Sequence, residues 1–411
     1  MGIQELPIEL LYVIFDLGAS PFVEQLEEGY QHPSRWRDTF TPSHMRFIFR
    51  HYLLLSQVSA TWRSILLEYG KAWAYVHLGR CAFVSRQFMS IDILARSAKH
   101  PLRLECVFSQ VSPLTPKPKP EAMKAFFAPH IDRIRSLRVA GPDTFISAIL
   151  DIFIDRTLSA SPSPSNPLIH LHIIQTYPQS GWVFPLELKL VAPRLTHLVV
   201  FGADIAHFPR WHLQKVVLEG GTFLPSKNHH EIFHNTPTRT LILDKIYIAG
   251  TPSIIGVRLT PFMSSITSLV LDGLQTFESN AESKTSLFAS FISLSLPKSL
   301  RDLKLANLSD EAVKGLMLVL ESVPAPYPPL YPELRRLGIE KLQFRSRSAC
   351  VTLAKVFSEI QSLELLEVTE DKTIFLDVWR SGGETGDSIW PLLDEIIIDG
   401  TAVQRPLIGG T

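Results

Sequence analysis

The stretch Leu300–Leu305 reads Leu-Arg-Asp-Leu-Lys-Leu, so leucine stands at its first, fourth and sixth positions. On an extended chain, the fourth and sixth side chains point to the same side. A strand this short turns its leucines toward a core that only a neighbouring copy of the same unit completes. The stretch therefore predicts a strand that is stable only beside others like it.

The same spacing of apolar residues recurs along the chain. Copies occur at Ile134–Val139, Leu168–Ile173, Leu195–Val200, Leu213–Leu218, Ile266–Leu271, Leu300–Leu305, Leu334–Ile339, Leu363–Val368 and Leu393–Ile398, with a weaker copy at Thr238–Leu243. Successive copies are separated by about 18 to 34 residues, which brackets the leucine-rich repeat period. The pattern resembles an irregular leucine-rich repeat, which implies an α/β solenoid with parallel strands over residues 80–411.

Helices are expected between the copies. Apolar residues recur at helical spacing over Asp310–Leu320, over Cys350–Ile360 and over Val84–Lys99, and the last of these is followed by an alternating strand at Leu102–Phe108. Proline-rich stretches, which predict loops, lie at residues 112–120, 159–167 and 323–329. The region after residue 79 therefore predicts a stack of strand and helix units joined by loops.

The N-terminal stretch Leu6–Phe15 predicts an amphipathic helix. Pro7 suits a first helical turn because its φ is fixed and it has no amide hydrogen. Leucine and other apolar residues then recur at a spacing of three to four, which places them on one face, and these are Leu10, Leu11, Ile14 and Phe15. A small helical module cannot bury such a face alone, so it must meet the rest of the chain or another protein.

The stretch Leu-Pro-x-Glu-Leu-Leu-x-x-Ile-Phe from Leu6, followed by Val58-Ser59-x-x-Trp62-Arg63 and then Trp73–Val76, resembles an F-box domain of the kind common in fungal proteins. The resemblance covers residues 3–79 and implies an N-terminal helical module, residues 1–79, that binds a Skp-type adaptor and through it a cullin scaffold. The adaptor-binding positions that it implies are Leu6, Pro7, Leu10, Leu11, Ile14, Phe15, Val58, Trp62 and Arg63, of which Trp62 also serves the internal packing of the module.

The two halves of this module are separated by a long insertion, Ala19–Arg50, where the family has a short connection. Its middle, Gly29–Ser34, predicts a loop, and Phe47, Phe49, Tyr52 and Leu53 resume an apolar pattern. An alternative is that the N-terminal face is the inner side of a cap on the open end of the repeats. The chain would then be a ligase-independent interaction scaffold.

Composition narrows the possible partners. Lys plus Arg and Asp plus Glu both number 40, so the formal charge is zero, which argues against a nucleic-acid partner. Cys81, Cys106 and Cys350 lie far apart and predict free thiols in a reducing compartment. Acidic residues interrupt the N-terminal apolar stretch, which argues against a signal peptide, and no apolar run is long enough to cross a membrane. We therefore expect a cytoplasmic or nuclear protein.

The strands also suggest where a client protein would bind. In Leu-x-Leu, the central residue and the residue after the second leucine point away from the repeat core. Such positions combine β-branched residues and acids, which predicts binding of a basic segment with apolar anchors. The predicted client-binding residues are Val217, Glu219, Ile242, Asp244, Val270, Asp272, Glu340 and Asp399, with Val199 and Ile397 at equivalent central positions. Alternatively, the acids cap turns and the β-branched row is buried on both faces.

The search for catalytic chemistry found one candidate. His230-Glu231-Ile232-Phe233-His234 matches the zinc-peptidase pattern, but Asn235-Thr236-Pro237 would end the helix directly after the second histidine. His170 and His172 alternate on a predicted strand, where a solvated face is the simpler interpretation than a metal site. Phosphate-loop, nucleophile-elbow and Cys-x-x-Cys motifs are absent from the sequence. We therefore expect no catalytic residues, no metal and no cofactor, and a protein that is not an enzyme.

Overall fold

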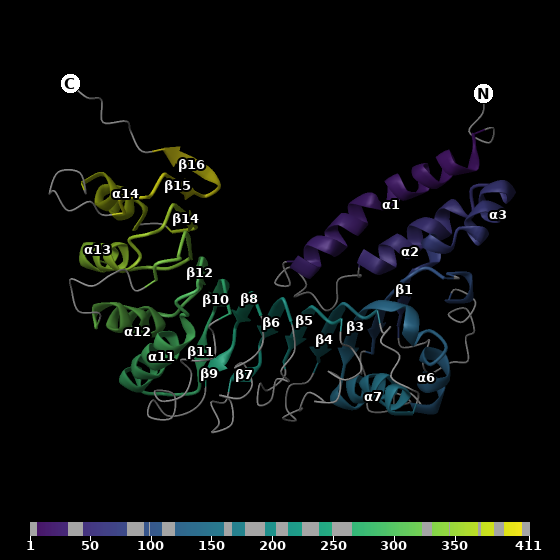
Figure 1. The fold of residues 1–411 in the computed structure, drawn as a ribbon, viewed down its shortest axis with the longest axis horizontal. Helices are drawn as coiled ribbons and strands as arrows, with labels where there is room; N and C mark the ends of the chain where they lie inside the picture. Colours follow the sequence, from purple (N-terminus) through teal and green to yellow (C-terminus); the bar gives the residue numbers. More distant parts are fainter. Residues whose placement is uncertain are drawn as a thin grey trace. The chain divides into compact units, whose positions relative to one another are not determined.

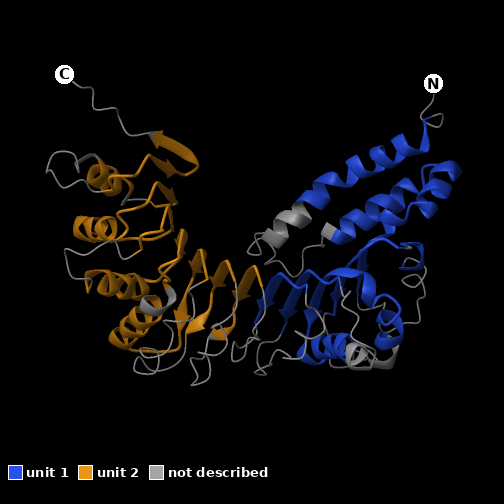
Figure 2. Cartoon of the chain, in the orientation of Figure 1, with its two compact units in different colours: residues 1–202 blue, residues 203–411 orange. Residues whose placement is uncertain are grey.

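The computed structural model describes residues 6–31, 44–79, 94–97, 99–108, 120–159, 167–176, 194–202, 213–223, 238–248, 265–322, 331–344, 346–368, 371–381 and 390–404. The chain forms two compact units, residues 1–202 and residues 203–411 (Figure 2). The boundary predicted after residue 79 lies inside the first unit and stays a prediction.

The first unit begins with helices and continues into a parallel sheet (Figure 1). Its helices are α1 (Ile8–Gln31), α2 (His44–Leu55), α3 (Ala60–Glu68), the short 3₁₀ helices Gly70–Trp73 and Ile131–Arg133, α6 (Pro120–Phe127) and α7 (Asp143–Ser159). Its strands are β1 (Tyr75–Leu78), β2 (Leu102–Val107), β3 (Ile134–Gly141), β4 (His170–Gln175) and β5 (His197–Phe201), which pair in parallel in this order. The first strand thus follows directly after the helical module.

The strands of the second unit belong to a main sheet and to a small second sheet. Its main strands are β6 (Lys215–Glu219), β8 (Thr240–Asp244), β10 (Ser268–Asp272), β12 (Asp302–Ala306), β13 (Arg336–Glu340), β14 (Ser362–Leu366) and β15 (Glu395–Ile398), which pair in parallel, and β16 (Thr401–Gln404), which is antiparallel to β15. A small parallel sheet contains β7 (Thr222–Phe223), β9 (Tyr247–Ile248) and β11 (Gln275–Thr276). The helices are α11 (Ala281–Ser295), α12 (Asp310–Glu321), α13 (Arg347–Val356) and α14 (Asp371–Ser381).

The leucines of successive strands form continuous buried rows. Leu269, Leu303 and Leu337 are paired from strand to strand, as are Leu271 and Leu305, and all of them are at most 2% exposed. Each such side chain contributes about 1.5–3 kcal/mol through burial, but only when the next strand covers it. The predicted fold, an α/β leucine-rich repeat solenoid with parallel strands, is therefore confirmed.

Some details of the predicted pattern were wrong. The copy placed at Leu363–Val368 is shifted by three residues, because Leu363 and Leu365 pair with Leu337 and Ile339. Ile360 is therefore the first apolar position of this copy, and α13 ends before it, at Val356.

The antiparallel strand β16 was not predicted, although Asp399-Gly400 is a typical signal for a two-residue hairpin turn. Both residues have positive φ, 48° and 83°.

A left-handed residue follows the end of successive strands in the second unit. These residues and their φ angles are Gly220 (64°), Lys245 (52°), Gly273 (59°), Asn307 (49°), Lys341 (53°) and Glu367 (50°). The amide of Lys245 donates to the carbonyl of Asp272, and the amide of Asn307 donates to that of Glu340, at 2.7 and 3.0 Å. The left-handed turn thus directs the next residue, such as Ile246 or Leu308, back into the core.

Candidate functional site

Helix α1 has two apolar faces, and only one of them is part of the core. Its first amide bonds run from Leu10 and Leu11 to the carbonyl of Pro7, at 3.0 and 3.2 Å, so Pro7 directly precedes the helix. The inner face consists of Leu11, Phe15 and Ala19, which are 2%, 0% and 1% exposed. Because these positions are four residues apart, they follow one side of the helix.

The side chains around Phe15 tie α1 to the rest of the module. The ring of Phe15 meets the ring of Trp62 edge-on at 5.0 Å, and His51 Nε2 lies 3.2 Å from the Phe15 carbonyl oxygen. Gly18 leaves room for His51, because a Cβ at this position would stand 2.6 Å from the imidazole. The inner face is therefore packed against both α2 and α3.

Asp16 adds a polar link beside the inner face. Its carboxylate accepts hydrogen bonds from the Tyr52 hydroxyl at 2.9 Å and the Tyr69 hydroxyl at 2.7 Å, and it pairs with the Lys71 ammonium at 2.6 Å. Burial raises the pKa of both tyrosines, and the neighbouring Asp16 charge raises it further. The two tyrosines therefore stay protonated as donors, and the module is held by polar as well as apolar contacts.

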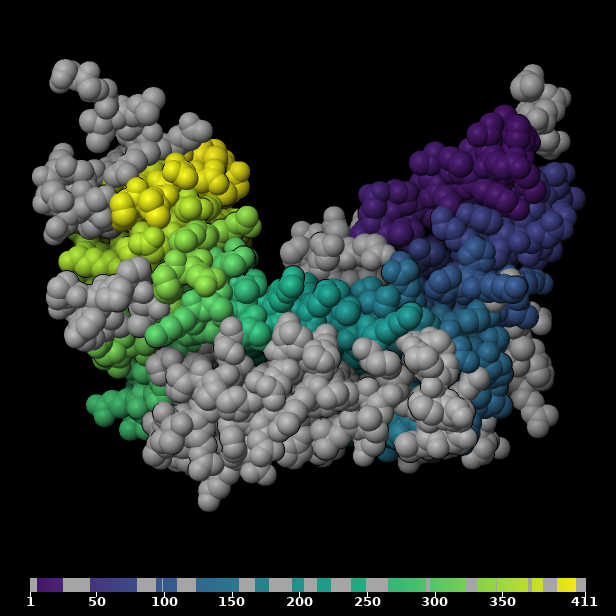
Figure 3. All heavy atoms as spheres, in the orientation of Figure 1, coloured from purple at the N-terminus to yellow at the C-terminus, as the bar shows by residue number. Residues whose placement is uncertain are grey.

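The outer face of α1 consists of Leu10, Val13, Ile14 and Leu17. They lie at positions i, i+3, i+4 and i+7 of the helix, and they are 49%, 53%, 38% and 66% exposed. The first part of α1 is open to view in the space-filling picture, where it is purple (Figure 3). A continuous apolar stripe of this kind is typical of a helix that binds another protein.

The structure corrects the single face predicted for this helix. The expected face of Leu10, Leu11, Ile14 and Phe15 divides, because Leu11 and Phe15 are core residues whereas Leu10 and Ile14 are on the outer face. The stretch Leu10–Ala19 is rich enough in apolar residues to form both stripes, and the periodicity alone does not say which one is buried. Adaptor binding by Leu11 or Phe15 would require the module to open.

The second half of the predicted module divides in the same way. Val58 is 62% exposed in the turn before α3, whereas Trp62 is 8% exposed and belongs to the core. Arg63 is exposed, and its Nε donates to the Ser56 carbonyl at 3.1 Å. Ser59 caps α3 by accepting a hydrogen bond from the amide of Trp62. Of the N-terminal positions before the helix, Leu6 is half-buried and Pro7 is exposed.

The long insertion is largely helical. Helix α1 continues to Gln31, so Gly29–Gln31 are helical where a loop was predicted, and residues 32–34 lie outside the described residues. The resumed apolar pattern forms α2, whose Phe47 stacks on Phe22 of α1 with ring centroids 5.6 Å apart. The insertion therefore lengthens the helical pair and leaves the outer face near the start of α1 open.

The predicted client-binding residues do not form one exposed surface. Val217, Glu219 and Asp244 are 1%, 6% and 2% exposed, so they were wrongly placed on the surface. Ile242, Val270, Asp272 and Glu340 are half-buried, and Asp399 is exposed in the hairpin turn. The equivalent central positions also vary, because Val199 is 7% exposed and Ile397 is half-buried. The predicted row of acids is interrupted at Ala306 and Leu366, which pair in register with its members.

Several of these acids have structural partners. Asp272 accepts a hydrogen bond from the Asn307 side chain at 2.7 Å, and Glu340 pairs with Lys304 at 2.7 Å. Asp399 pairs with the ammonium of Lys372 and accepts from the amide of Glu367, and these bonds lower its pKa. The alternative interpretation, in which acids cap turns, therefore holds for Asp399.

A polar row in the first unit, buried at Glu105, Arg138 and His172, was not predicted from the sequence. His77, Glu105, Arg138 and His172 are paired in this order across β1–β4, on the side of the sheet opposite the leucines. Glu105 is fully buried and binds the Arg138 guanidinium, and its second oxygen lies 2.7 Å from His77 Nδ1. His172 is 3% exposed, so the solvated strand face expected for it was wrong.

We expect His170 to make the stability of the first unit depend on pH. Its ring lies 4.7 Å from that of His197, and burial, followed by His197, Arg103 and Arg135, lowers the pKa of His170 to about 4. An unfolded histidine titrates near pH 6.5. Between about pH 6.5 and pH 4 the unfolded chain therefore takes up a proton that the folded chain does not, so stability falls as pH falls.

We expect the variant His170→Gln to lose less stability on acidification than the wild type. Between about pH 7 and about pH 4.5 the difference should be on the order of 1–2 kcal/mol, because a partly solvated site weakens the full effect. This difference is measured by hydrogen exchange of peptides from β4, followed by mass spectrometry at both pH values. If both proteins lose the same stability on acidification, His170 does not contribute to the pH dependence.

The candidate metal ligands and the cysteines lie only partly among the described residues. Among them, no group of three or more His, Cys, Asp or Glu side chains is placed to hold a metal ion. His230, Glu231 and His234 lie outside the described residues. Cys106 and Cys350 are buried free thiols, and burial raises the pKa of Cys106 well above its usual range.

Of the helices that the structure describes, none has both the length and the apolar character that a membrane crossing requires.

Comparisons with known proteins find a structural likeness but no matching family. No family model matches the chain. No curated protein matches it either. Among solved structures, it is similar to the leucine-rich repeat-containing protein LegL7 from Legionella pneumophila, with a TM-score of 0.44 and 13% sequence identity over 80% of this chain and 93% of that chain. At this TM-score the likeness carries no argument about family or function.

Proposed function

We propose that this protein is the substrate-recognition subunit of a Skp-cullin-F-box type ubiquitin ligase. The N-terminal module would bind a Skp-type adaptor, and the repeat units would bind a client protein. The observation that carries the proposal is the outer face of α1, Leu10, Val13, Ile14 and Leu17, which stays exposed although the opposite side of the same helix is buried. Leaving four large apolar side chains in water is unfavourable unless a partner covers them.

The order of the sequence motifs supports this choice of partner. The outer face belongs to the Leu-Pro-x-Glu-Leu-Leu segment, and the exposed Val58 belongs to the second F-box-like segment, which ends in Trp62 and Arg63. Trp62 would act indirectly, because it packs against Phe15 and fixes the position of α1. The adaptor would therefore contact Leu10, Ile14 and their neighbours, while Leu11, Phe15 and Trp62 maintain the shape of the module.

In this function the protein would perform no bond chemistry. It would hold a client lysine near the activated ubiquitin carrier and raise the effective concentration of the two reactants. The stacked strands suit this role, because within each unit every repeat adds side chains beside those of its neighbour. A ligase-independent interaction scaffold is the second candidate function. The same repeats would support it if the outer face of α1 binds a protein other than a Skp-type adaptor.

Adaptor binding tests the proposal directly. We expect the full chain with Leu10→Glu and Ile14→Glu to bind a purified Skp-type adaptor at least about 100-fold more weakly than the wild type, because two carboxylates would be buried in an apolar contact. Isothermal titration calorimetry measures the affinity. The circular dichroism of the variant should equal that of the wild type, since both positions are exposed.

A matched control carries Leu318→Glu and Leu392→Glu, which change two exposed leucines outside the module, at 52% and 42% exposure. This control should bind the adaptor as the wild type does. If the wild type itself fails to bind, the ligase function is wrong and the scaffold function becomes the better description. Equal loss in both double variants would likewise contradict the proposed contact.

A further inference from the structure

The helical module and the first strand of the sheet are joined without a linker. Helix α3 ends at Glu68, the 3₁₀ helix Gly70–Trp73 follows, and β1 begins at Tyr75. Ala74 stands between the 3₁₀ helix and the strand, and its amide donates to the carbonyl of Lys71 at 3.1 Å. The end of the module therefore passes directly into the start of the sheet.

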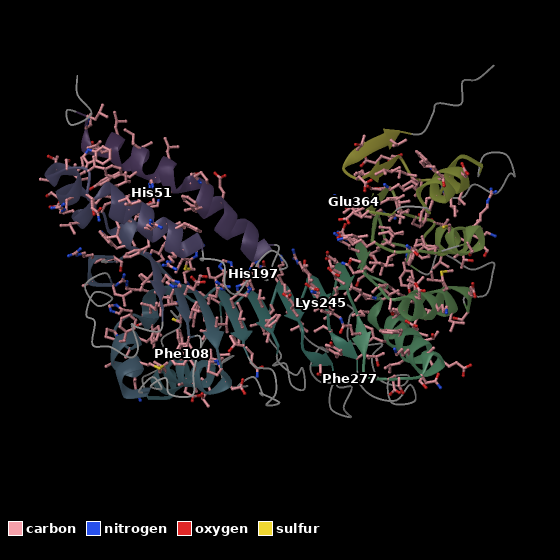
Figure 4. All side chains as sticks on the ribbon, turned by 180° about the vertical axis from the view of Figure 1, so that it is seen from behind. His51, Phe108, His197, Lys245, Phe277 and Glu364 are labelled. Atoms are coloured by element: carbon pink, nitrogen blue, oxygen red, sulfur yellow. The ribbon has the colours of Figure 1, made fainter. Side chains whose placement is uncertain are left out.

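The side chain of Trp73 contacts two helices of the module. It is 2% exposed, and its Nε1 donates to the carbonyl of Leu66 in α3 at 2.7 Å. Its ring meets the ring of Phe49 in α2 edge-on, with centroids 6.2 Å apart. Figure 4 labels His51, which lies on the same helix α2. One buried indole thus holds the ends of α2 and α3 together.

The same tryptophan also contacts the segment that leads into β2. The guanidinium carbon of Arg96 lies 5.5 Å from the centroid of the Trp73 ring. Gly70 allows this segment to approach, because a Cβ at Gly70 would stand 2.8 Å from the imidazole of His100. Arg133, directly before β3, donates to the carbonyl of His100 at 3.2 Å. The approach to β2 is therefore fixed on one side by Trp73 and on the other by the start of β3.

The first two strands are joined by backbone and side chains. The amide of Arg103 donates to the carbonyl of Ala74 at 2.9 Å, and Arg103 is paired in register with Tyr75. The guanidinium carbon of Arg103 lies 5.3 Å from the centroid of the Tyr75 ring. In Figure 1, α2 lies beside β1, and the two elements are in contact. Moving Trp73 would therefore disturb the module and the two strands together.

Shared buried contacts have a measurable consequence. Segments that depend on the same contacts open together, as one cooperative unit. A partner that binds only the closed form of such a unit makes opening rarer by the factor 1 + [L]/Kd, where [L] is the free partner concentration. Every segment of the unit then gains the same protection, including segments that the partner does not contact.

We propose that Trp73 couples the helical module to the first strands of the sheet, so that α1–α3, β1 and β2 open as one cooperative unit. A partner bound to the outer face of α1 then also stabilises β1 and β2. The coupling is reciprocal, because it is an equilibrium property. This inference rests on the proposed function in that the Skp-type adaptor serves as the partner. Trp73 is thus a positioning residue, which holds the adaptor-binding helix in place on the repeats.

Native-state hydrogen exchange of the full chain, followed by mass spectrometry, tests the coupling. The probe is a purified Skp-type adaptor at about 100 times its Kd, which should slow exchange in α2 and α3 about 100-fold. We expect the same factor in β1 and β2 and no change in β13 of the second unit. Slowing that is confined to α1–α3 would overturn the inference.

Substitutions of Trp73 separate coupling from simple destabilisation. Trp73→Phe keeps an aromatic ring but removes the indole N–H, and Trp73→Ala removes both. In Trp73→Ala the adaptor should slow exchange in β1 and β2 less than about tenfold, with Trp73→Phe between this value and the wild type, while α2 keeps its full slowing. A merely destabilising change would raise the rates with and without adaptor and leave their ratio unchanged.

The matched control is Trp379→Phe, which changes a fully buried tryptophan in α14. It should leave the adaptor-dependent slowing in β1 and β2 as in the wild type. If Trp73→Ala fails to fold and bind the adaptor, Trp73→Phe decides the question. Wild-type slowing of β1 and β2 in Trp73→Phe would contradict the role of Trp73.

A measurement without adaptor separates this inference from the proposed function. Phe15→Ala should accelerate exchange in β1 and β2 by the same factor as in α2, about 100-fold or more, because the whole unit loses the same buried ring. Unchanged exchange in β1 and β2 would overturn the coupling. If the adaptor does not bind the wild type, the ligase function fails, and the Phe15→Ala result still decides whether the module and the strands are coupled.

Discussion

Phe15→Ala is expected to lower the local stability of the N-terminal module by about 3–5 kcal/mol, the usual cost of removing a buried phenylalanine ring. Phe15 is fully buried and packs against Trp62, so its loss leaves a cavity between α1 and α3. Native-state hydrogen exchange of peptides from α2 and α3 measures the change, since it reports the free energy of local opening.

The matched control for this prediction is Leu17→Ala on the same helix. Leu17 is 66% exposed, so truncating it should change stability by no more than about 0.5 kcal/mol. Similar losses at Phe15 and Leu17 would contradict the assignment of an inner and an outer face. The comparison matters for function, because only a stable inner face keeps the outer leucines free for a partner.

Glu105→Ala is expected to destabilise the first unit by a similar amount, about 3–5 kcal/mol. The substitution leaves the buried Arg138 guanidinium without the Glu105 carboxylate, and it also removes one partner of His77. Hydrogen exchange of peptides from β2 and β3 measures the effect. The loss should be distributed across both strands, because Glu105 and Arg138 are directly paired in register.

The double variant Glu105→Leu with Arg138→Leu distinguishes a charge effect from a packing effect. Replacing both members of a buried ion pair with apolar side chains is often close to neutral, whereas removing one member is costly. We therefore expect the double variant to be more stable than Glu105→Ala. If the double variant is less stable than Glu105→Ala, the ion pair contributes more to the stability of the sheet than two apolar side chains do in its place.

The repeat strands could be predicted from the sequence because their signal is local. Leu303 and Leu305 alternate with the charged residues Asp302 and Lys304, and this alternation fixes both the strand and its buried side. At Leu363 the same signal was ambiguous, because Leu366 and Val368 imitate a second copy of the pattern. Only the pairing with β13 decides between the two registers.

The candidate site was harder to predict because burial depends on the other elements. Leu10 and Leu11 are equally apolar neighbours, and only the positions of α2 and α3 determine that Leu11 is buried and Leu10 exposed. Glu105 and Arg138 occupy central strand positions that normally face solvent, and their charges gave no sign of burial.

The most direct test of the account is whether a Skp-type adaptor covers the outer face of α1. Leu17→Cys places a thiol at its most exposed position, and Leu318→Cys places one on α12 as a control. The rate of maleimide labelling of each peptide, measured by mass spectrometry with and without saturating adaptor, reports coverage. The account predicts that the adaptor slows labelling at residue 17 and leaves residue 318 unchanged, whereas equal labelling of residue 17 in both samples would contradict it.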